Sequence, residues 1–557
     1  GLLCIGVEVV LEITVPLLMA DLIDYGVTNA DGTYIIKKGL QMALCAVLAL
    51  ILGVGSAKFS ALAGQGLGAN IRKAEYEKLQ SYSFSNIDHF SVSSLVTRLT
   101  SDVTNIQNAV STGMRPFGRS PVMLIFATSF AFRINSTLAL VFLVALPTLA
   151  VLLILIIINV GPLYGRMQSA IDQVNRCIQE NLTAIRVVKS YVRGDYEVEK
   201  FGVVNENLKS ESEKAFGTAV LNMPAMQFVM YGTILGILLI GGRLINEGQM
   251  MIGQLTSFLS YVLLILNSLM MMSNVFLLMT RSLASAERIM EVIDEKIDIT
   301  DENAKDIAVA KGEIEFDHVW FKYKDTAKEY VLSDVSFHIK PGQTVGIIGQ
   351  TGSSKTTLVQ LIPRLYDVTK GEVKIDGINV KEYPVRHLRD SVAMVLQKNT
   401  LFSGSLIDNL RWGNENATLD EIKEACQIAC VDEFVDRLAD GYDTEMGQEG
   451  VNVSGGQKQR ICIARAILKK PKVLILDDST SAVDTATEAK IRSGLAEKLP
   501  DMTKIIIAQR ISSVRHADQI IIMDRGHVEA IGTHESLLRD NQIYQEIYAS
   551  QKEGADL

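Results

Sequence analysis

The stretch VGIIGQTGSSKTT (Val345–Thr357) decides the fold of the C-terminal half of the chain. Its apolar run up to Gly349 predicts a buried strand, and the residues from Lys355 onward predict a helix. Such a glycine-rich turn presents backbone N–H groups and a helix N-terminus to phosphates. Lys355 is expected at the β- and γ-phosphates and Thr356 at Mg²⁺. The predicted nucleotide-binding residues of this loop are Gly349, Gln350, Thr351, Gly352, Ser353, Ser354, Lys355, Thr356 and Thr357.

One position in this loop departs from the usual pattern. A phosphate loop of the form G-x-x-x-x-G-K-[ST] has Gly where this chain has Ser354. Serine adds a Cβ atom at a point where the backbone runs close to the phosphates. We expect nucleotide binding to survive this substitution.

Two further segments complete the nucleotide motifs. LILDD (Leu474–Asp478) predicts an apolar strand that ends in two acids, of which Asp477 should hold Mg²⁺. In VSGGQKQR (Val453–Arg460), Ser454 can cap a helix, while Gly455 and Gly456 let the backbone approach an anion closely. The three segments together indicate that ATP drives this protein.

The N-terminal half is apolar, and it predicts a membrane domain. Hydrophobic residues make up 48% of the 557 residues and concentrate before about residue 285. A helix needs about 20 apolar residues to span a bilayer. We count about six such stretches, at 1–20, 38–62, 116–133, 137–160, 220–242 and 253–280. The chain opens at Gly1 inside the first stretch, and we expect a short N-terminal piece to be missing.

Two long polar connections, 64–115 and 162–215, have helical patterns and carry many Arg and Lys residues. This basic character puts them in the cytoplasm, on the same side as the C-terminal half. The predicted fold is an α-helical six-span transmembrane domain (1–290), a linker (291–311) and an α/β phosphate-loop domain (312–557). The net charge of −9 gives no support for a nucleic-acid partner.

Glu8 and Glu12 lie four residues apart on one face of the first predicted span. Ionisable groups inside a span are costly and usually face a cavity or a partner. One interpretation is a contact with a cationic substrate. The alternatives are a polar contact between helices, or a position near the membrane surface.

The order of these motifs resembles the ATP-binding cassette exporters that carry a membrane domain ahead of the cassette, and the resemblance covers essentially the whole chain. It implies that Tyr323 stacks on adenine and that Gln397 is the Q-loop glutamine, a Mg²⁺ ligand with Thr356 and Asp477. It also implies that Ser454, Gly455, Gly456 and Gln457 form the signature that contacts a partner's ATP. SSLVTRLTSDV (Ser93–Val103) and IRVVKSYVRGDYE (Ile185–Glu197) resemble the two cytoplasmic loops that dock on cassettes.

Two positions differ from a fully active cassette. By the resemblance, Asp478 stands where a general-base Glu is usual, and Gln509 stands where a His is usual. Asp is one methylene shorter, so its carboxylate sits on the order of 1 Å farther from the water, which can cost about 10²-fold in rate. Gln can donate a hydrogen bond to a phosphate, but it cannot become cationic as His can. The signature carries no comparable change.

This combination resembles the degenerate-site subunit of heterodimeric bacterial multidrug exporters. It implies an ATP-hydrolysing translocase with ATP and Mg²⁺ as cofactors, in the plasma (inner) membrane with its cassette in the cytoplasm. The implied partner is a second half-transporter that completes the hydrolytic site, and the implied substrates are amphipathic drugs, lipids or peptides. A slow homodimer and a non-transporting, ATP-gated or regulatory subunit are the alternatives.

Overall fold

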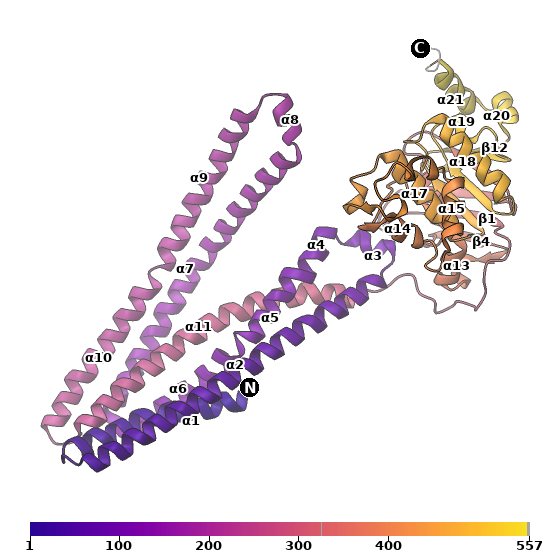
Figure 1. The fold of residues 1–557 in the computed structure, drawn as a ribbon. Coiled ribbons are helices and arrows are strands. Elements are labelled where there is room, and N and C mark those ends of the chain that lie inside the picture. The colour runs from indigo at the N-terminus through magenta and orange to yellow at the C-terminus, as the bar shows by residue number, and fades with distance from the viewer. Residues whose placement is uncertain (325, 554–557) are drawn as a thin grey trace. The chain divides into compact units, whose positions relative to one another are not determined.

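The structure, a computed structural model, describes residues 1–324 and 326–553 and forms two compact units (Figure 1). The first unit consists of Gly1–Lys78 and Ser93–Asp294. The second consists of Leu79–Val92 and the chain from Glu295 onward. The segment Leu79–Val92, which lies in the first long polar connection of the sequence, therefore groups with the C-terminal part of the chain.

The first unit is helical. Its helices are α1 (Leu2–Asp21), η1 (Leu22–Val27), α2 (Gly32–Gln80), α4 (Val92–Thr97), η2 (Arg98–Asp102), α5 (Val103–Ser111), α6 (Met114–Ile134), α7 (Ser136–Thr183), α8 (Ile185–Ser190), α9 (Gly194–Ala219), α10 (Asn222–Asn246) and α11 (Ile252–Asp294). At 1.5 Å per residue, α2 is about 70 Å long, well beyond the roughly 30 Å hydrocarbon core of a bilayer. Helices α7 and α9 lie side by side, with the short α8 between them at their tip (Figure 1).

The number of spans differs from the sequence count. Within the described residues, five helical segments are long and apolar enough to cross a membrane, and they are Leu2–Val27, Gly32–Gln80, Ser136–Thr183, Gly194–Asn246 and Ile252–Met272. Helix α6 covers the remaining predicted span, but Arg115, Arg119 and Arg133 lower its mean hydropathy. The structure thus confirms a helical membrane domain and leaves the count of six unconfirmed.

Ion pairs tie the segment Arg98–Asp102 to the last long helix, α11. Asp102 accepts a hydrogen bond of 2.8 Å from Arg288 Nε and another of 2.8 Å from Ser285 Oγ. Arg98 Nη2 lies 2.6 Å from Glu291 Oε2 on the same helix, α11. The hydrogen bond from Arg288 lowers the pKa of Asp102 below its ordinary value. These contacts fix η2 and α5 against α11.

The second unit is an α/β domain. Its larger sheet has the strand order β12-β11-β3-β10-β9-β6, parallel except for β12, and a smaller antiparallel sheet has the order β2-β1-β4-β5. The strands are β1 (Ile314–Phe321), β2 (Leu332–Ile339), β3 (Thr344–Ile348), β4 (Lys370–Ile375), β5 (Ile378–Asn379), β6 (Val392–Val395), β7 (Gly404–Ser405), β8 (Glu445–Met446), β9 (Val473–Asp477), β10 (Thr503–Ile507), β11 (Gln519–Asp524) and β12 (His527–Gly532). Every residue of β9 and β10 is buried, as parallel strands covered on both faces require.

The helices of this unit cover the larger sheet and continue to the C-terminus. They are α3 (Phe84–His89), α12 (Lys355–Gln360), η3 (Val380–Glu382), α13 (Val385–Ser391), α14 (Leu406–Arg411), α15 (Leu419–Ile428), α16 (Asp432–Val435), η4 (Gly441–Asp443), η5 (Gln448–Gly450), α17 (Gly455–Leu468), α18 (Thr485–Lys498), α19 (Ile511–Val514), α20 (His534–Asp540) and α21 (Gln542–Glu553). One apolar core joins the two sheets through Phe316, Val345 and Ile475. Another packs α15 and α17 on the larger sheet, so the ends of β3 and β9 are held rigidly.

Candidate functional site

The loop between β3 and α12 has the backbone that its sequence predicts. A Cβ atom on Gly349 would lie 2.2 Å from the carbonyl oxygen of Met523, so only glycine fits there. Gly352 has a φ of +86° and Ser354 a φ of +70°, both in the left-handed region. An L-residue pays about 1–2 kcal/mol for that conformation, so Ser354 is strained where glycine would not be.

Lys355 folds over this loop. Its Nζ atom donates hydrogen bonds to the carbonyl oxygens of Gly349 (2.8 Å) and Gln350 (2.9 Å) and to Ser353 Oγ (3.3 Å). Burial lowers the pKa of Lys355, against the effect of nearby Asp478 and Asp477. A partly buried cation at the mouth of a loop of N–H groups is suited to hold phosphate oxygens.

Thr356 and Asp477 meet at the carboxyl end of β9. Thr356 Oγ1 donates to Asp477 Oδ1 at 3.1 Å, while Asp477 Oδ2 is buried and lacks a hydrogen-bond partner within the described chain. Burial also raises the pKa of Asp477. A buried, unpaired carboxylate oxygen beside a hydroxyl group fits Mg²⁺, which prefers hard oxygen ligands.

These groups line one cavity of about 310 Å³, together with residues from three other segments. Its lining comprises Thr351, Gly352, Ser353, Ser354, Lys355, Thr356, Thr357, Gln397, Asp477, Asp478, Ile507 and Gln509. Gln350 lines an adjoining cavity that α21 borders. The fold thus brings the phosphate loop together with Gln397, both acids of LILDD and Gln509.

Asp478 and Gln509 contact each other directly. Gln509 Nε2 donates a hydrogen bond of 2.8 Å to Asp478 Oδ2. Burial raises the pKa of Asp478, and the hydrogen bond from Gln509 opposes that shift. The helix α21 reaches the same place, since Gln551 Nε2 donates to the carbonyl oxygen of Gln509 and Gln551 Oε1 accepts from the backbone N–H of Ile511, both at 2.8 Å.

Tyr323 lies at the end of β1 near the phosphate-loop helix. Its hydroxyl is 2.8 Å from Thr357 Oγ1, and 43% of the residue is exposed, which leaves ring surface accessible to a ligand. Its ring stands edge-on to Tyr366 with 5.2 Å between centroids. Tyr366 in turn donates a hydrogen bond of 2.6 Å to Asp88 on α3 and contacts Phe84.

Sequence inspection missed Tyr366 and Asp88. Together with Tyr323 they connect the short helix α3 to the residue that follows Thr356. The sequence holds no local signal for this connection, because Asp88 and Tyr366 are far apart in the chain. Only the placement of Leu79–Val92 in the second unit reveals it.

The signature residues lie outside the described lining of the phosphate-loop cavity. Ser454 caps α17, its Oγ accepting from the backbone N–H of Gln457 while Gln457 Oε1 accepts from that of Ser454. A Cβ on Gly456 would lie 2.7 Å from the carbonyl oxygen of Ala482. The loop that contains Ala482, after β9, therefore packs directly on the start of α17. Ser454 and Gly455 are exposed and free to face another chain.

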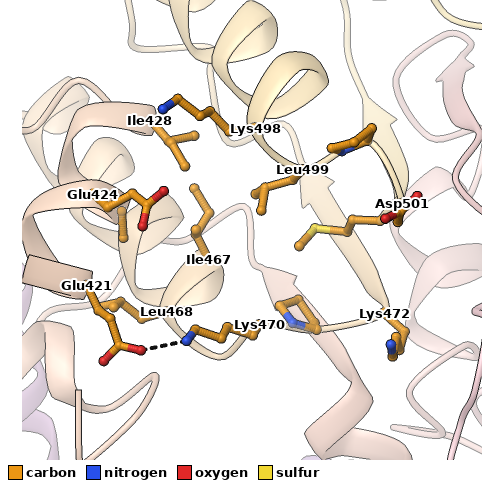
Figure 2. Close-up of a pocket in the computed structure, with 14 residues that line it drawn as sticks. Glu421, Glu424, Ile428, Ile467, Leu468, Lys470, Lys472, Lys498, Leu499 and Asp501 are labelled. Atoms are coloured by element: carbon orange, nitrogen blue, oxygen red, sulfur yellow. Dashed lines mark hydrogen bonds and ion pairs between the residues drawn. The ribbon is translucent and has the colours of Figure 1, made fainter. Parts of the chain in front are cut away.

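A second cavity, of about 340 Å³, lies between α15 and the ends of α17 and α18 (Figure 2). Glu421 Oε1 is 2.6 Å from Lys470 Nζ there, and this hydrogen bond lowers the pKa of Glu421 to about 2. None of the predicted nucleotide-binding residues is among the described residues that line it. We therefore assign the candidate nucleotide site to the phosphate-loop cavity.

Known proteins match the chain over its whole length. Residues 1–269 match the ABC transporter transmembrane region, and residues 332–481 match the ABC transporter domain. The uncharacterized ABC transporter ATP-binding protein YfiB of Bacillus subtilis is 39% identical over 99% of this chain and 96% of its own. A putative multidrug export ATP-binding/permease protein of the same species, YgaD, is 31% identical over 99% and 95%.

Other similar proteins are named for different activities. The ATP-dependent lipid A-core flippase of Pseudomonas putida is 32% identical over 92% of this chain and 86% of its own. Among solved structures, a bacterial Atm1-family ABC exporter with ATP bound has a TM-score of 0.83 at 23% identity, covering 98% of this chain and 96% of that one. This similarity shows that the two chains share a fold.

Proposed function

The chain belongs to the ABC transporters that join a transmembrane region and an ATP-binding domain in one polypeptide, and we propose that it is the half with the impaired ATP site in a heterodimeric exporter. As a member of this family it is an integral membrane protein and an ATP-driven exporter subunit, with its ATP-binding domain in the cytoplasm. The proposal concerns its own ATP site, its partner and its substrate.

The hydrogen bond between Gln509 and Asp478 carries the proposal. A general base must orient a water toward the γ-phosphate, and here the shorter carboxylate is engaged by a neutral amide. Gln509 supplies no cation to the developing charge. Weak positioning of this kind costs about 10²-fold or more in rate. The strained Ser354 falls on the same side of the cassette.

In this proposal the site still binds Mg·ATP. Lys355 contacts the phosphates, Tyr323 contacts adenine, and Thr356, Gln397 and Asp477 hold Mg²⁺. The bound Mg²⁺ neutralises charge on the phosphates. The unpaired Asp477 Oδ2 and the partly buried Lys355 support this assignment, because a cation and an anion respectively would compensate them.

A partner chain is the second element of the proposal. Ser454, Gly455, Gly456 and Gln457 keep an intact cap, and they would complete a hydrolytic site on the partner's phosphate loop. The tip of the second cytoplasmic loop supports a partner as well. Val187, Tyr191 and Val192, on and beside α8, are 57%, 75% and 87% exposed, which is unusual for apolar side chains placed so close together.

The proposal also names a class of substrate. A relative named as a putative multidrug exporter and another named as a lipid A-core flippase are similar to this chain at nearly the same identity. Both names point to molecules with an apolar part. We infer an amphipathic substrate, among drugs, lipids and peptides.

Co-purification followed by two matched substitutions tests the proposal. The complex that assembles with this chain is isolated, and its ATPase rate is measured for Gly455→Asp and for Asp478→Ala. Gly455→Asp should nearly abolish turnover, because a carboxylate would repel the γ-phosphate bound to the partner. Asp478→Ala should reduce turnover far less. Equal losses, or brisk turnover by this chain alone that Asp478→Asn abolishes, would contradict the asymmetric assembly.

A further inference from the structure

Four charged side chains meet inside the transmembrane unit, and we call them the charge tetrad. Glu8 and Glu12 come from α1, and Arg115 and Arg119 come from α6. Glu8 Oε1 lies 2.5 Å from Arg115 Nη2 and 3.4 Å from Arg119 Nη1, and Glu12 Oε2 lies 2.5 Å from Arg119 Nη2. The polar contact between helices that the sequence left open is therefore present.

The charge tetrad forms one wall of a cavity of about 750 Å³. This volume falls within the usual range for small-molecule sites, about 300–1,000 Å³. The rest of the lining is mostly apolar: α2 contributes Cys45, Ala49 and Leu50, and α11 contributes Leu263 and Leu264 together with the polar Ser260 and Asn267. The cavity thus offers charge at one place and apolar surface elsewhere, as an amphiphile requires.

The charge tetrad is not fully satisfied by its own contacts. Glu8 is only 3% exposed, yet its Oε2 atom has no hydrogen-bond partner anywhere in the described residues, and neither has Arg115 Nε. The side chains of Arg115, Arg119 and Glu12 keep 38%, 24% and 28% of their surface open. A Cβ on Gly53 would lie 3.0 Å from Arg115 Nη2, so α2 closes over the Glu8–Arg115 pair at that point.

The charges of the tetrad sum to zero, and both signs reach the cavity. A ligand of net charge bound here would leave one charge uncompensated in a low-dielectric region, where an unpaired charge is expensive. A ligand with one positive and one negative group leaves none. The cation of such a ligand can pair with Glu12 while its anion pairs with Arg115 or Arg119, so that every charge keeps a partner of opposite sign.

The position along the helices sets the orientation of the ligand. An ion pair of 2.7 Å between Asp21 and Lys38 marks the end of α1 and α2 opposite the predicted cytoplasmic connection 64–115, which begins on α2. With this ion pair taken as the outer boundary of a bilayer core about 30 Å thick, Glu8 lies roughly 20 Å further along α1 at 1.5 Å per residue, which is in the cytoplasmic half. Cys45, Ala49 and Leu50 lie between Lys38 and Gly53 along α2, toward the outer surface. A headgroup at the charge tetrad would point its chain outward, like a lipid of the cytoplasmic leaflet.

We propose that this cavity binds a zwitterionic lipid amphiphile, with its headgroup on the charge tetrad and its apolar chain along α2 and α11. The proposal deepens the proposed export function, on which it rests, by naming the class of substrate. It replaces the cationic substrate that Glu8 and Glu12 suggest by themselves, because Arg115 and Arg119 already balance their charge.

The test is a binding measurement on the full chain, together with its partner where the two co-purify, in nonionic detergent and without nucleotide. The probes are phosphatidylethanolamine, phosphatidylglycerol and an alkylammonium compound, each with the same fluorescent chain, and free phosphoethanolamine. The variants are Glu12→Gln and Arg119→Gln, since loss of the more buried Glu8 would leave Arg115 without its ion-pair partner. Arg133→Gln is the matched control, because Arg133 lies on α6 outside this cavity and contacts Phe130.

Wild type should bind the phosphatidylethanolamine probe about tenfold more tightly than either charged probe, and free phosphoethanolamine should not compete. Glu12→Gln makes the site net positive and should move its preference to phosphatidylglycerol, whereas Arg119→Gln should move it to the alkylammonium probe. Arg133→Gln should leave the preference unchanged. Equal binding of all three probes, a wild-type preference for the cation, or preferences that neither variant moves would overturn the proposal.

The readout separates this proposal from the export function. Binding is measured without ATP, so loss of ATP-driven transport in vesicles with the binding pattern intact would count against export alone. Transport of the probes with preferences that the variants leave unchanged would count against the cavity alone.

Discussion

Gln509 Nε2 and Asp478 Oδ2 are joined by a hydrogen bond of 2.8 Å. The side chains at the two positions that differ from a fully active cassette therefore bind each other. Their effects on catalysis should therefore not be independent, because residues that act as a unit give non-additive losses and gains. The general-base position cannot be repaired without also changing its partner.

The first prediction concerns that repair. In a Gly455→Asp background, which disables the proposed partner-completed site, Asp478→Glu alone should raise residual ATPase by less than about tenfold. The double change Asp478→Glu with Gln509→His should raise it by about 10²-fold, because base and cation are restored together. Steady-state phosphate release measures both. A single Asp478→Glu variant as active as the double would show that the hydrogen bond is irrelevant.

The second prediction concerns Ser354. Ser354→Gly removes left-handed strain and should raise the free energy of unfolding by about 0.5–1 kcal/mol. Both tryptophans of the chain, Trp320 and Trp412, lie in the ATP-binding unit, so denaturation followed by tryptophan fluorescence reports on that unit. Ser353→Gly is the control and should lower stability, because it deletes an acceptor of Lys355 without relieving strain.

The third prediction concerns the contact between α3 and the nucleotide site. Tyr366→Phe keeps the ring against Phe84 and Tyr323 but deletes the hydrogen bond to Asp88. ATP binding should stay within about twofold, while stimulation of ATPase by transported substrate should fall several-fold, since α3 lies in the connection 64–115 that the sequence predicts to dock on the cassette.

Tyr383→Phe is its control. This equally buried tyrosine donates a hydrogen bond to the carbonyl oxygen of Ile375, away from α3. It should cost stability of about 1 kcal/mol and leave stimulation unchanged. If both variants changed stimulation alike, the contact through Asp88 would have no special part in it.

The fourth prediction is a pH dependence. Arg288 lowers the pKa of Asp102 in the folded protein, so this carboxylate stabilises the fold above the ordinary Asp value. The stabilisation is lost as pH falls through the lowered pKa. The thermal midpoint of helix loss, followed by circular dichroism, should therefore drop in wild type as the pH falls below about 4, the ordinary pKa of Asp. Asp102→Asn should show a lower midpoint at neutral pH and a smaller drop.

The nucleotide motifs could be read from the sequence because each is local. The strand β3, the turn at Gly349 and the helix α12 follow from neighbouring residues, as does the cap that Ser454 and Gln457 form. The strain at Ser354 was also foreseeable from the glycine that its pattern leads one to expect. The span count was less secure, because arginines in α6 obscure its hydropathy.

The side-chain pairings in the two cavities could not be predicted from the sequence. Glu8 and Glu12 suggest a cation site until Arg115 and Arg119 approach them from a helix more than a hundred positions away. Asp478 and Gln509 follow the ends of different strands, β9 and β10, and nothing in either segment shows that their side chains meet. Such contacts depend on how helices and strands pack, which no local pattern encodes.

The hydrogen bonds of Gln551 have a practical consequence. Its side chain is hydrogen-bonded to the backbone of both Gln509 and Ile511, so α21 fixes the loop that carries Gln509 at the phosphate-loop cavity. An affinity tag or fluorescent fusion that pulls this helix away should change nucleotide binding in the phosphate-loop cavity without touching any residue that lines it. Labels on this transporter are therefore better placed elsewhere.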